Sequence, residues 1–257
     1  MKVIDLENIE IGRVIRLDSH RIICGDSTDP KIVDKLLNGI KIDCWINDEP
    51  YGIGTVESKQ ELLGYSSHQV IQNDQLQSEA EHKAFIKSWI QPVLPYLNKK
   101  NSIYFFNSDK MIFAMREAMQ EYGLKFSQLI IWVKSQPVIG RLDYLPQHEL
   151  IAYGWYGTHK FRHSKDKSVL FYPKPSKSKL HPTMKPVALL RNLILNSTET
   201  GDVVLDNFLG SGSTLIACEH TGRRCYSIEL DPGYVAVIIR RWEKLTGKRA
   251  EYEDDSE

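Results

Sequence analysis

Short apolar runs alternate with segments of helical periodicity along most of the chain, and this alternation constrains the fold more than any other feature. Apolar runs bounded by glycine, proline or small polar residues predict strands, whereas apolar residues spaced three and four apart predict helices. Strands that alternate with helices predict an α/β fold with a mostly parallel central sheet and helices on both faces. The 257 residues fit a single domain, 1–257, whose acidic end, 251–257, we expect to be disordered.

The expected elements follow from this pattern. Strands are predicted at 14–17, 21–24, 43–46, 102–106, 126–133, 147–155, 203–205 and 226–229, the first two as a hairpin and 126–133 as a buried strand. Helices are predicted after Asp29 or Thr28, at 78–97 with a break at Pro92 and Pro95, and at 110–122, 186–196, 215–221 and 234–246. The polar, aperiodic stretch 55–77 predicts a loop beside the ligand cleft.

Composition excludes several classes of protein. Lys plus Arg and Asp plus Glu both number 33, so net charge argues neither for nor against a nucleic-acid partner. The four cysteines show no CxxC spacing, which favours buried free thiols over a disulfide framework or a metal site. The N-terminus has neither a basic start nor an apolar segment, and no apolar run approaches ~18 residues. We therefore expect a cytoplasmic protein that is not anchored in a membrane.

The predicted strand 43–46 ends in a turn that suits a flat ligand with an amino group. Pro50 restricts the backbone of the preceding residue, and Gly52 lets the chain turn away. Asp48 and Tyr51 would face one cleft, so that a hydrogen-bond acceptor lies beside an aromatic ring that a nucleobase could stack on. The alternative is a loop in which the aspartate caps a helix and the tyrosine packs on the core.

A second ligand-binding turn follows the predicted strand 203–205, where a glycine-containing loop, 206–214, leads into a helix. In this arrangement backbone N–H groups and the helix N-terminus face the ligand. The loop lacks both the dinucleotide spacing G-x-G-x-x-G and the lysine of a phosphate-binding loop. Glu229 ends a strand roughly twenty residues later, where an acid binds ribose hydroxyls in nucleoside-binding folds. S-adenosylmethionine fits both features.

The segment between residues 156 and 185 carries many cations interleaved with aromatic residues and a single acid, Asp166. Such a segment predicts either a solvated loop or a surface that tracks nucleic-acid phosphates. The candidate DNA-binding cations are Lys160, Arg162, Lys165, Lys167, Lys174, Lys177 and Lys179. We assign the region 136–180 to a short target-recognition segment within the domain.

In this order and spacing the motifs resemble the amino-methylating DNA methyltransferases that carry Asp-Pro-Pro-Tyr, with the catalytic motif before the cofactor motif, a permuted order. The nearest likeness is to the ParB-associated and phage methylase domains. Besides the two turns, the resemblance covers residues 20–28, 131–134, 148–149, 180–186 and 239–243. It implies a Rossmann-like fold and methyl transfer from S-adenosylmethionine to an exocyclic amino group, most often adenine N6, of a base flipped out of double-stranded DNA.

The resemblance also assigns roles to individual residues. The catalytic residues would be Asp48, Glu49 through its backbone carbonyl, Pro50 and Tyr51. The cofactor-binding residues would be Asp26, Thr183, Lys185, Asp206, Phe208, Gly210, Gly212, Ser213, Thr214 and Glu229. We interpret His148 and Glu149 as structural, and no metal site is expected. The resemblance leaves room for a homodimer and for a cognate restriction endonuclease as partners, and the residues decide neither.

Three positions depart from the family pattern: Glu49 replaces the first proline of the catalytic motif, Asn207 replaces a proline and Leu209 a glycine. Position 49 needs only a carbonyl for the chemistry, and Pro50 still restricts its backbone. Two alternatives to an adenine-N6 enzyme therefore stay open. One is a cytosine-N4 methyltransferase, and the other is a catalytically weakened homologue that binds DNA or cofactor.

Overall fold

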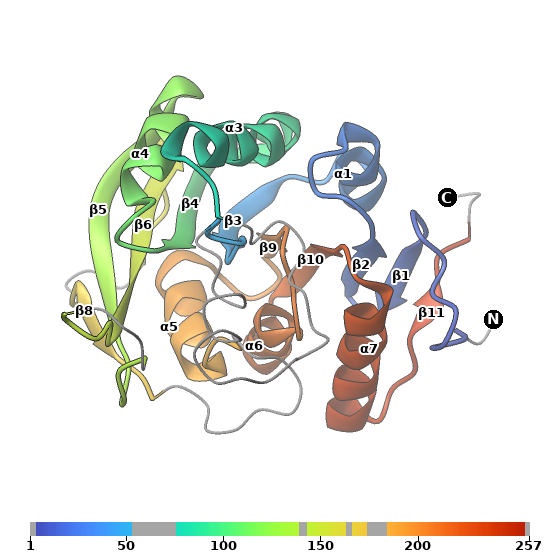
Figure 1. Ribbon diagram of the computed structural model, residues 1–257. Helices are drawn as coiled ribbons and strands as arrows, with labels where there is room; N and C mark the ends of the chain where they lie inside the picture. Colours follow the sequence, from blue (N-terminus) through green and yellow to red (C-terminus); the bar gives the residue numbers. More distant parts are fainter. Residues whose placement is uncertain (1–3, 53–75, 139–142, 163–165, 174–183, 255–257) are drawn as a thin grey trace.

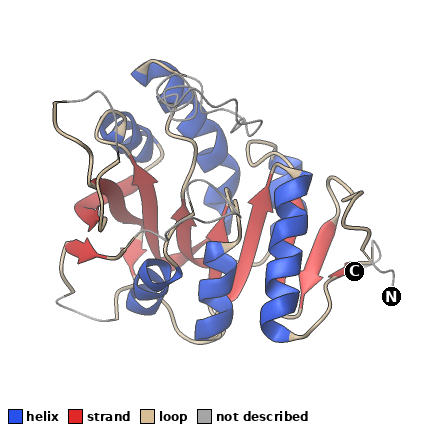
Figure 2. Ribbon diagram, turned by 60° about the horizontal axis from the view of Figure 1, so that its bottom comes forward, coloured by secondary structure: helices blue, strands red, loops and turns tan. Residues whose placement is uncertain are grey.

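The computed structural model describes residues 4–52, 76–138, 143–162, 166–173 and 184–254, which form one continuous sheet with helices on both faces (Figure 1, Figure 2). The strand order is β11-β1-β2-β10-β9-β3-β4-β6-β5-β8, and β7 pairs with β4 outside this path. The central strands β2, β10, β9, β3 and β4 are parallel, whereas β6 is antiparallel to both of its neighbours. The α/β prediction with a mainly parallel sheet is confirmed.

The strands have the following bounds: β1 Val14–Leu17, β2 His20–Cys24, β3 Ile42–Asn47, β4 Leu97–Asn107, β5 Leu124–Val133, β6 His148–Tyr156, β7 Thr158–His159, β8 Val169–Phe171, β9 Val203–Asp206, β10 Arg224–Glu229 and β11 Glu251–Tyr252. The helices are α1 Pro30–Leu37, α3 Glu79–Ile90, α4 Ile112–Glu121, α5 Val187–Ser197, α6 Ser213–Thr221 and α7 Pro232–Thr246. Helices α1, α3 and α4 cover one face of the sheet, and α5, α6 and α7 cover the other (Figure 1).

Local sequence signals explain where the helices begin and end. The Asp29 side chain accepts a hydrogen bond from the Lys31 N–H and caps α1. At α3, Ser78 and Glu81 form a reciprocal capping box. The break expected at Pro92 is confirmed, because α3 ends at Ile90 and a 3-10 helix, Gln91–Tyr96, leads into β4. Over the described residues, no helix combines the length and apolarity needed to span a bilayer.

Strands β3 and β9 lie side by side at the centre of the sheet although they are far apart in the chain. Cys44 pairs with Val204, and Trp45 pairs with Leu205. From β9 the chain continues to β10 on one side, whereas from β3 it continues to β4 on the other. The carboxyl ends of two such strands open a crevice for ligands at the edge of the sheet. The two predicted ligand turns therefore meet at this position.

Three expectations about strands need correction. Strand β5 is not a buried strand: only Leu124 and Trp132 in it are buried, because β5 lies next to the last strand of the sheet. The acidic end is ordered through Glu251 and Tyr252, which form β11 beside β1. The segment 136–180 is not all a peripheral recognition segment, because β6 lies between β4 and β5 in the central sheet.

Candidate active site

The turn after β3 brings Asp48 and Tyr51 into direct contact. The Tyr51 hydroxyl lies 2.8 Å from Asp48 Oδ1 and 3.0 Å from Glu149 Oε2, so its single proton is shared between two carboxylates. Gly52 closes the turn with a positive φ of 65°, and a Cβ there would lie 2.6 Å from Gln77 Oε1. The Gln77 side chain can move aside, so it is the positive φ, which strains any other residue, that favours glycine here.

Two buried lysines balance the two acids. Lys185 Nζ lies 2.5 Å from Asp48 Oδ1 and 3.1 Å from Glu149 Oε2, and Lys134 Nζ lies 2.7 Å from Glu149 Oε1. The rings of Tyr51, Phe106 and Trp132 surround the Lys185 ammonium, with centroids 5.1 to 6.0 Å away. Such rings stabilise a desolvated cation. We call Asp48, Tyr51, Lys134, Glu149 and Lys185 the carboxyl-edge cluster.

The cluster fixes the charge state of its members. Burial alone would raise the pKa of Glu149, but Lys185 and Lys134 outweigh it and lower this pKa to about 2. Burial likewise opposes the charge on Lys185, yet Asp48 and Glu149 raise its pKa above the usual value. For Asp48, burial outweighs the attraction of Lys185 and raises the pKa. Lys185 and Glu149 are therefore permanently charged, and Asp48 is the acid of this cluster most sensitive to its surroundings.

Sequence reasoning missed Lys134 and the role of Glu149. The structural interpretation of Glu149 is incomplete, because this acid contacts Tyr51 and Lys185. Lys185, which the resemblance assigns to the cofactor, has Asp48 and Glu149 as its partners in the structure. A usable signal was the direction of β6. This strand runs antiparallel to β4, so it begins at the end of the sheet where β3 finishes, and its first residues lie near the catalytic turn.

The turn after β9 is built as a compact elbow. Asp206 is buried, accepts a hydrogen bond from the Phe208 N–H at 2.9 Å and bonds Thr214, and burial raises its pKa to about 7. Gly210 and Gly212 both have positive φ, and a Cβ at Gly212 would lie 3.3 Å from the Ile238 side chain of α7. The elbow therefore packs closely against α7 and presents the start of α6 at the sheet edge.

Asn207, where the family has a proline, joins the two turns. Its N–H donates to Asn47 Oδ1 at 2.9 Å, and its own Oδ1 accepts from Trp45 Nε1 at 2.8 Å. Trp45 Nε1 also lies 3.1 Å from Asn47 Oδ1, so one buried indole contacts both turns. A proline at 207 has no N–H and could not make the first contact. The departure at Asn207 thus has a partner in Asn47.

The strand ends beside the elbow supply two further acids. The Glu229 carboxylate accepts hydrogen bonds from the N–H groups of Gly210 at 2.7 Å and Asp231 at 2.9 Å, and burial raises its pKa to about 7. Asp26 is exposed, and its Oδ1 accepts from the Thr28 N–H and hydroxyl, both at 2.8 Å. Most elbow N–H groups donate within the protein, so what this edge offers a nucleoside cofactor is a pair of acids, Glu229 and the exposed Asp26, as acceptors.

The remaining predicted cofactor residues differ in their surroundings. Phe208 is half buried, and its ring packs against Phe85 at 6.0 Å and Trp89 at 5.7 Å between centroids, so the structure gives it a packing role. Ser213 and Thr214 are buried in the first turn of α6. Leu209 is buried in the core below the elbow. Thr183 lies outside the described residues.

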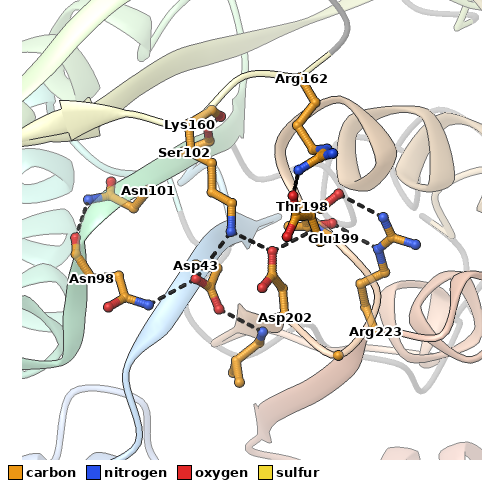
Figure 3. A network of polar contacts seen from close by, with 12 residues as sticks. Asp43, Asn98, Asn101, Ser102, Lys160, Arg162, Thr198, Glu199, Asp202 and Arg223 are labelled. Carbon is orange, nitrogen blue, oxygen red and sulfur yellow. Dashed lines mark hydrogen bonds and ion pairs between the residues drawn. The ribbon is translucent and has the colours of Figure 1, made fainter.

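The predicted DNA-binding cations Lys160 and Arg162 lie at the opposite edge of the sheet, where β3 and β9 begin (Figure 3). Lys160 Nζ lies 2.5 Å from Asp202 Oδ2 and 3.4 Å from Asp43 Oδ1, and Arg162 pairs with Glu199. These contacts give both cations structural partners, which argues against the predicted DNA contacts. Lys167 is exposed beside β8. The other predicted cations, Lys165, Lys174, Lys177 and Lys179, lie outside the described residues.

Fold and site together define the class: a Rossmann-like α/β protein with a nucleoside-binding elbow beside an Asp-x-Pro-Tyr turn. A sequence model of the DNA methylase family matches residues 42–240, and the chain belongs to this family, which comprises adenine-N6 and cytosine-N4 enzymes. S-adenosylmethionine is the methyl donor of the family. The resemblance inferred from the motifs is thereby confirmed.

Several known methyltransferases are similar to the chain. Type II methyltransferase M.HpaI of Haemophilus parainfluenzae is 26% identical over 86% of this chain and 74% of its own length. The solved structure of M1.HpyAVI with S-adenosylmethionine aligns with a TM-score of 0.63 at 24% identity, covering 86% of this chain and 98% of that one. The cytosine-N4-specific PvuII DNA methyltransferase aligns with a TM-score of 0.67 at 17% identity, covering 88% and 89%. At these identities the structural likeness concerns the fold.

Proposed function

We propose that the protein transfers a methyl group from S-adenosylmethionine to the exocyclic amino group of a flipped DNA base, and that this group is N6 of adenine. The main support is the position of Asp48 and Tyr51 at the carboxyl end of β3, directly beside the elbow after β9. An amino-group acceptor and a stacking ring are thus next to a nucleoside-binding site. Stacking on Tyr51 returns roughly 1–3 kcal/mol of the cost of flipping the base.

Asp48 accepts a hydrogen bond from one N–H of the target amine, and the backbone carbonyl of Glu49 accepts a hydrogen bond from the second N–H. Both acceptors together turn the nitrogen lone pair toward the methyl group, which the bound cofactor supplies as an electrophile. Both described contacts of Asp48 are made by Oδ1, and a quarter of the side chain is exposed, so the carboxylate is accessible to an incoming base. Asp48 takes up the proton that the amine loses.

Lys185 keeps Asp48 ready for this role. Burial favours the protonated acid, which is a poorer acceptor, and the ammonium 2.5 Å away counteracts it. Glu149 and Lys134 hold Lys185 in place through their own ion pair. The cluster therefore works as a pre-organised electrostatic unit whose groups need no rearrangement when the base arrives.

For the cofactor, we assign the ribose to Glu229, the adenine to the vicinity of Asp26, and the methionine portion to the elbow glycines Gly210 and Gly212. Support comes from the positions of all four residues on the edge where Asp48 lies. Glu229 already accepts two backbone N–H bonds, so ribose hydroxyls would use its outer lone pairs.

Nucleoside mass spectrometry of unmethylated plasmid, incubated with the protein and S-adenosylmethionine, tests the proposal. We expect N6-methyladenine. N4-methylcytosine would instead identify the alternative, cytosine-N4 methylation. The cytosine-N4-specific PvuII enzyme shares this fold. Absence of both products, with cofactor binding shown by calorimetry, would overturn catalysis and favour the weakened homologue that Glu49 suggested.

A further inference from the structure

Glu49 replaces the first proline of the catalytic motif, and its side chain is only 2% exposed. Its Oε1 accepts a hydrogen bond from Asn107 Nδ2 at 3.2 Å, and Asn107 is the last residue of β4. The Asn107 side chain is itself fixed, because its Oδ1 accepts from the Ser108 N–H at 2.7 Å. The Glu49 side chain therefore connects the catalytic turn to the end of the neighbouring strand.

The surroundings of Glu49 suit a carboxylic acid and not a carboxylate. Among the described residues, Oε2 of Glu49 has no hydrogen-bond partner and Oε1 accepts from a neutral amide, so that only this amide and the backbone N–H of Glu49 itself donate to the carboxyl group. The nearby ammonium of Lys185 is bound by Asp48 and Glu149. A buried carboxylate with so little compensation costs several kcal/mol. Burial, with the adjacent Asp48, accordingly raises the pKa of Glu49 well above its usual value.

We propose that Glu49 is a positioning residue that acts as an uncharged carboxylic acid: through Asn107 it holds the Asp48 turn against the end of β4. A side-chain contact thus replaces the rigidity that a proline ring gives to this position in the family. The proposal rests on the proposed function in one respect, namely that Asp48 accepts the target amine. Ionised Glu49 would place a second negative charge beside Asp48 and weaken the contact, so transfer would fall as pH rises through the raised pKa of Glu49.

Among the residues that the structure describes, few titratable groups act on Glu49. Asp48 on the same turn disfavours its ionisation, and Lys185 before α5 favours it. Tyr51 stays protonated, because burial and the neighbouring carboxylates raise its pKa well above the usual value. On α3, His82 is buried, and burial lowers its pKa to about 4, so it is neutral throughout the alkaline range. A fall in transfer as pH rises, with its origin in the turn, would therefore come from Glu49.

The decisive experiment compares the pH dependence of methyl transfer, at saturating plasmid and S-adenosylmethionine, for the native protein and three variants. Glu49→Gln should keep most of the rate that Glu49→Ala loses, and it should lack the fall in rate that the native protein shows as pH rises through the raised pKa of Glu49. Glu49→Pro, which restores rigidity by another route, should also lack this fall. A Glu49→Gln profile that superimposes on the native one, or a loss as deep as that of Asp48→Asn, would overturn the proposal.

Unfolding measured against pH gives a readout that does not need activity. An acid whose folded-state pKa is raised keeps a proton that the unfolded chain has released. The free energy of unfolding therefore falls as pH rises from 4.5, the usual glutamate pKa, toward the raised value. Asp48, Asp206 and Glu229, whose pKa values are also raised, contribute to the same decline, so Glu49→Gln should make it shallower, and an unchanged decline would contradict the uncharged state. If no variant methylates DNA, the proposed function fails, while this slope still decides the state of Glu49.

A double-mutant cycle tests the contact itself. If Glu49 positions the turn through Asn107, then Glu49→Ala and Asn107→Ala remove the same interaction. Their effects on the transfer rate should be less than additive, because the first substitution already abolishes the hydrogen bond that the second would abolish. Fully additive effects would show that the two residues act separately and would overturn the assignment of Asn107 as the partner.

Discussion

Strand β3 carries an aspartate near each end, and the two ends are built differently. At its start, Asp43 accepts hydrogen bonds from the Val203 N–H at 3.0 Å and Asn98 Nδ2 at 2.9 Å, and it pairs with Lys160 (Figure 3). We call Asp43, Lys160 and Asp202 the amino-edge network. After its end, Asp48 belongs to the carboxyl-edge cluster. In each group one lysine pairs with two acids: Lys160 with Asp43 and Asp202, and Lys185 with Asp48 and Glu149.

The two groups differ in what they hold together. In the amino-edge network, Asp202 also accepts a hydrogen bond from the Glu199 N–H at 2.6 Å, and Arg223 bonds both the hydroxyl and the carbonyl of Thr198 nearby. Backbone groups of connecting segments are thus satisfied there. In the carboxyl-edge cluster, side chains mainly contact other side chains, and Tyr51 shares one proton between two acids. Similar charges therefore stabilise the fold at one edge and remain available for chemistry at the other.

The largest expected effect comes from exchanging the aspartate at each end. Asp48→Asn should lower the rate of methyl transfer at least ~10²-fold, because the target amine loses its charged acceptor. Cofactor affinity, measured by calorimetry, should change little. The matched variant Asp43→Asn should lower thermal stability and leave the transfer rate per folded molecule intact. Loss of cofactor binding in Asp48→Asn would refute the division into two sites.

The two lysines give the next contrast. Lys185→Met leaves Asp48 and Glu149 without their shared cation, so the transfer rate should fall roughly 10-fold or more, because Asp48 is then more readily protonated. Lys160→Met should destabilise the fold by about 1–3 kcal/mol, because two partly buried acids lose their partner. Denaturant unfolding and single-turnover kinetics separate the two effects. Equal rate losses would remove the distinction between the edges.

Salt dependence tests which cations contact DNA. Because Lys160 and Arg162 are paired at the amino edge, Lys160→Gln with Arg162→Gln should leave the salt dependence of DNA affinity unchanged. The corresponding change of Lys174, Lys177 and Lys179 should lower the slope of log affinity against log salt by about 0.9 for each phosphate that is no longer neutralised. Fluorescence anisotropy with a duplex measures both. A smaller slope in the Lys160 and Arg162 variant would show that these two cations do contact DNA.

A smaller effect concerns the pH dependence of cofactor binding. Burial raises the pKa of Glu229 to about 7, so this acid is protonated below that pH and ionised above it. Only the carboxylate offers all its lone pairs to ribose hydroxyls, so affinity for S-adenosylmethionine should rise as pH increases through about 7. Glu229→Gln should bind more weakly and without this rise. Burial gives Asp206 a pKa of about 7 as well, so a rise that persists in Asp206→Asn, whatever the affinity of that variant, would assign the titration to Glu229.

Local sequence signals predicted most of the scaffold. The Asp29 cap and the proline break after Ile90 each act within a few residues, so they were predicted without the structure. The two ligand turns were also predicted, because each combines an apolar strand with glycine or proline at its end. The exposure of β5 was not predictable in the same way, since it depends on the place of the strand in the sheet.

The site was predicted less completely than the scaffold, because several of its residues have partners in distant segments of the chain. Lys160 looked like a free cation, but its acids come from β3 and from the segment before β9. Glu149 looked structural, although the order β3-β4-β6 brings it to Tyr51. In both cases the sequence shows which charges exist, whereas the strand order decides which of them meet.

Trp45 has a consequence for spectroscopy. Its indole N–H contacts the side-chain oxygens of Asn47 and Asn207, one from each ligand turn, at 3.1 and 2.8 Å. The ring is fully buried and packs edge-on against Trp89 and Phe105, so it sits in an asymmetric and dry environment. The emission maximum and near-ultraviolet dichroism of this indole therefore depend on the relative placement of both turns. The protein carries a native optical reporter at the junction of its two sites.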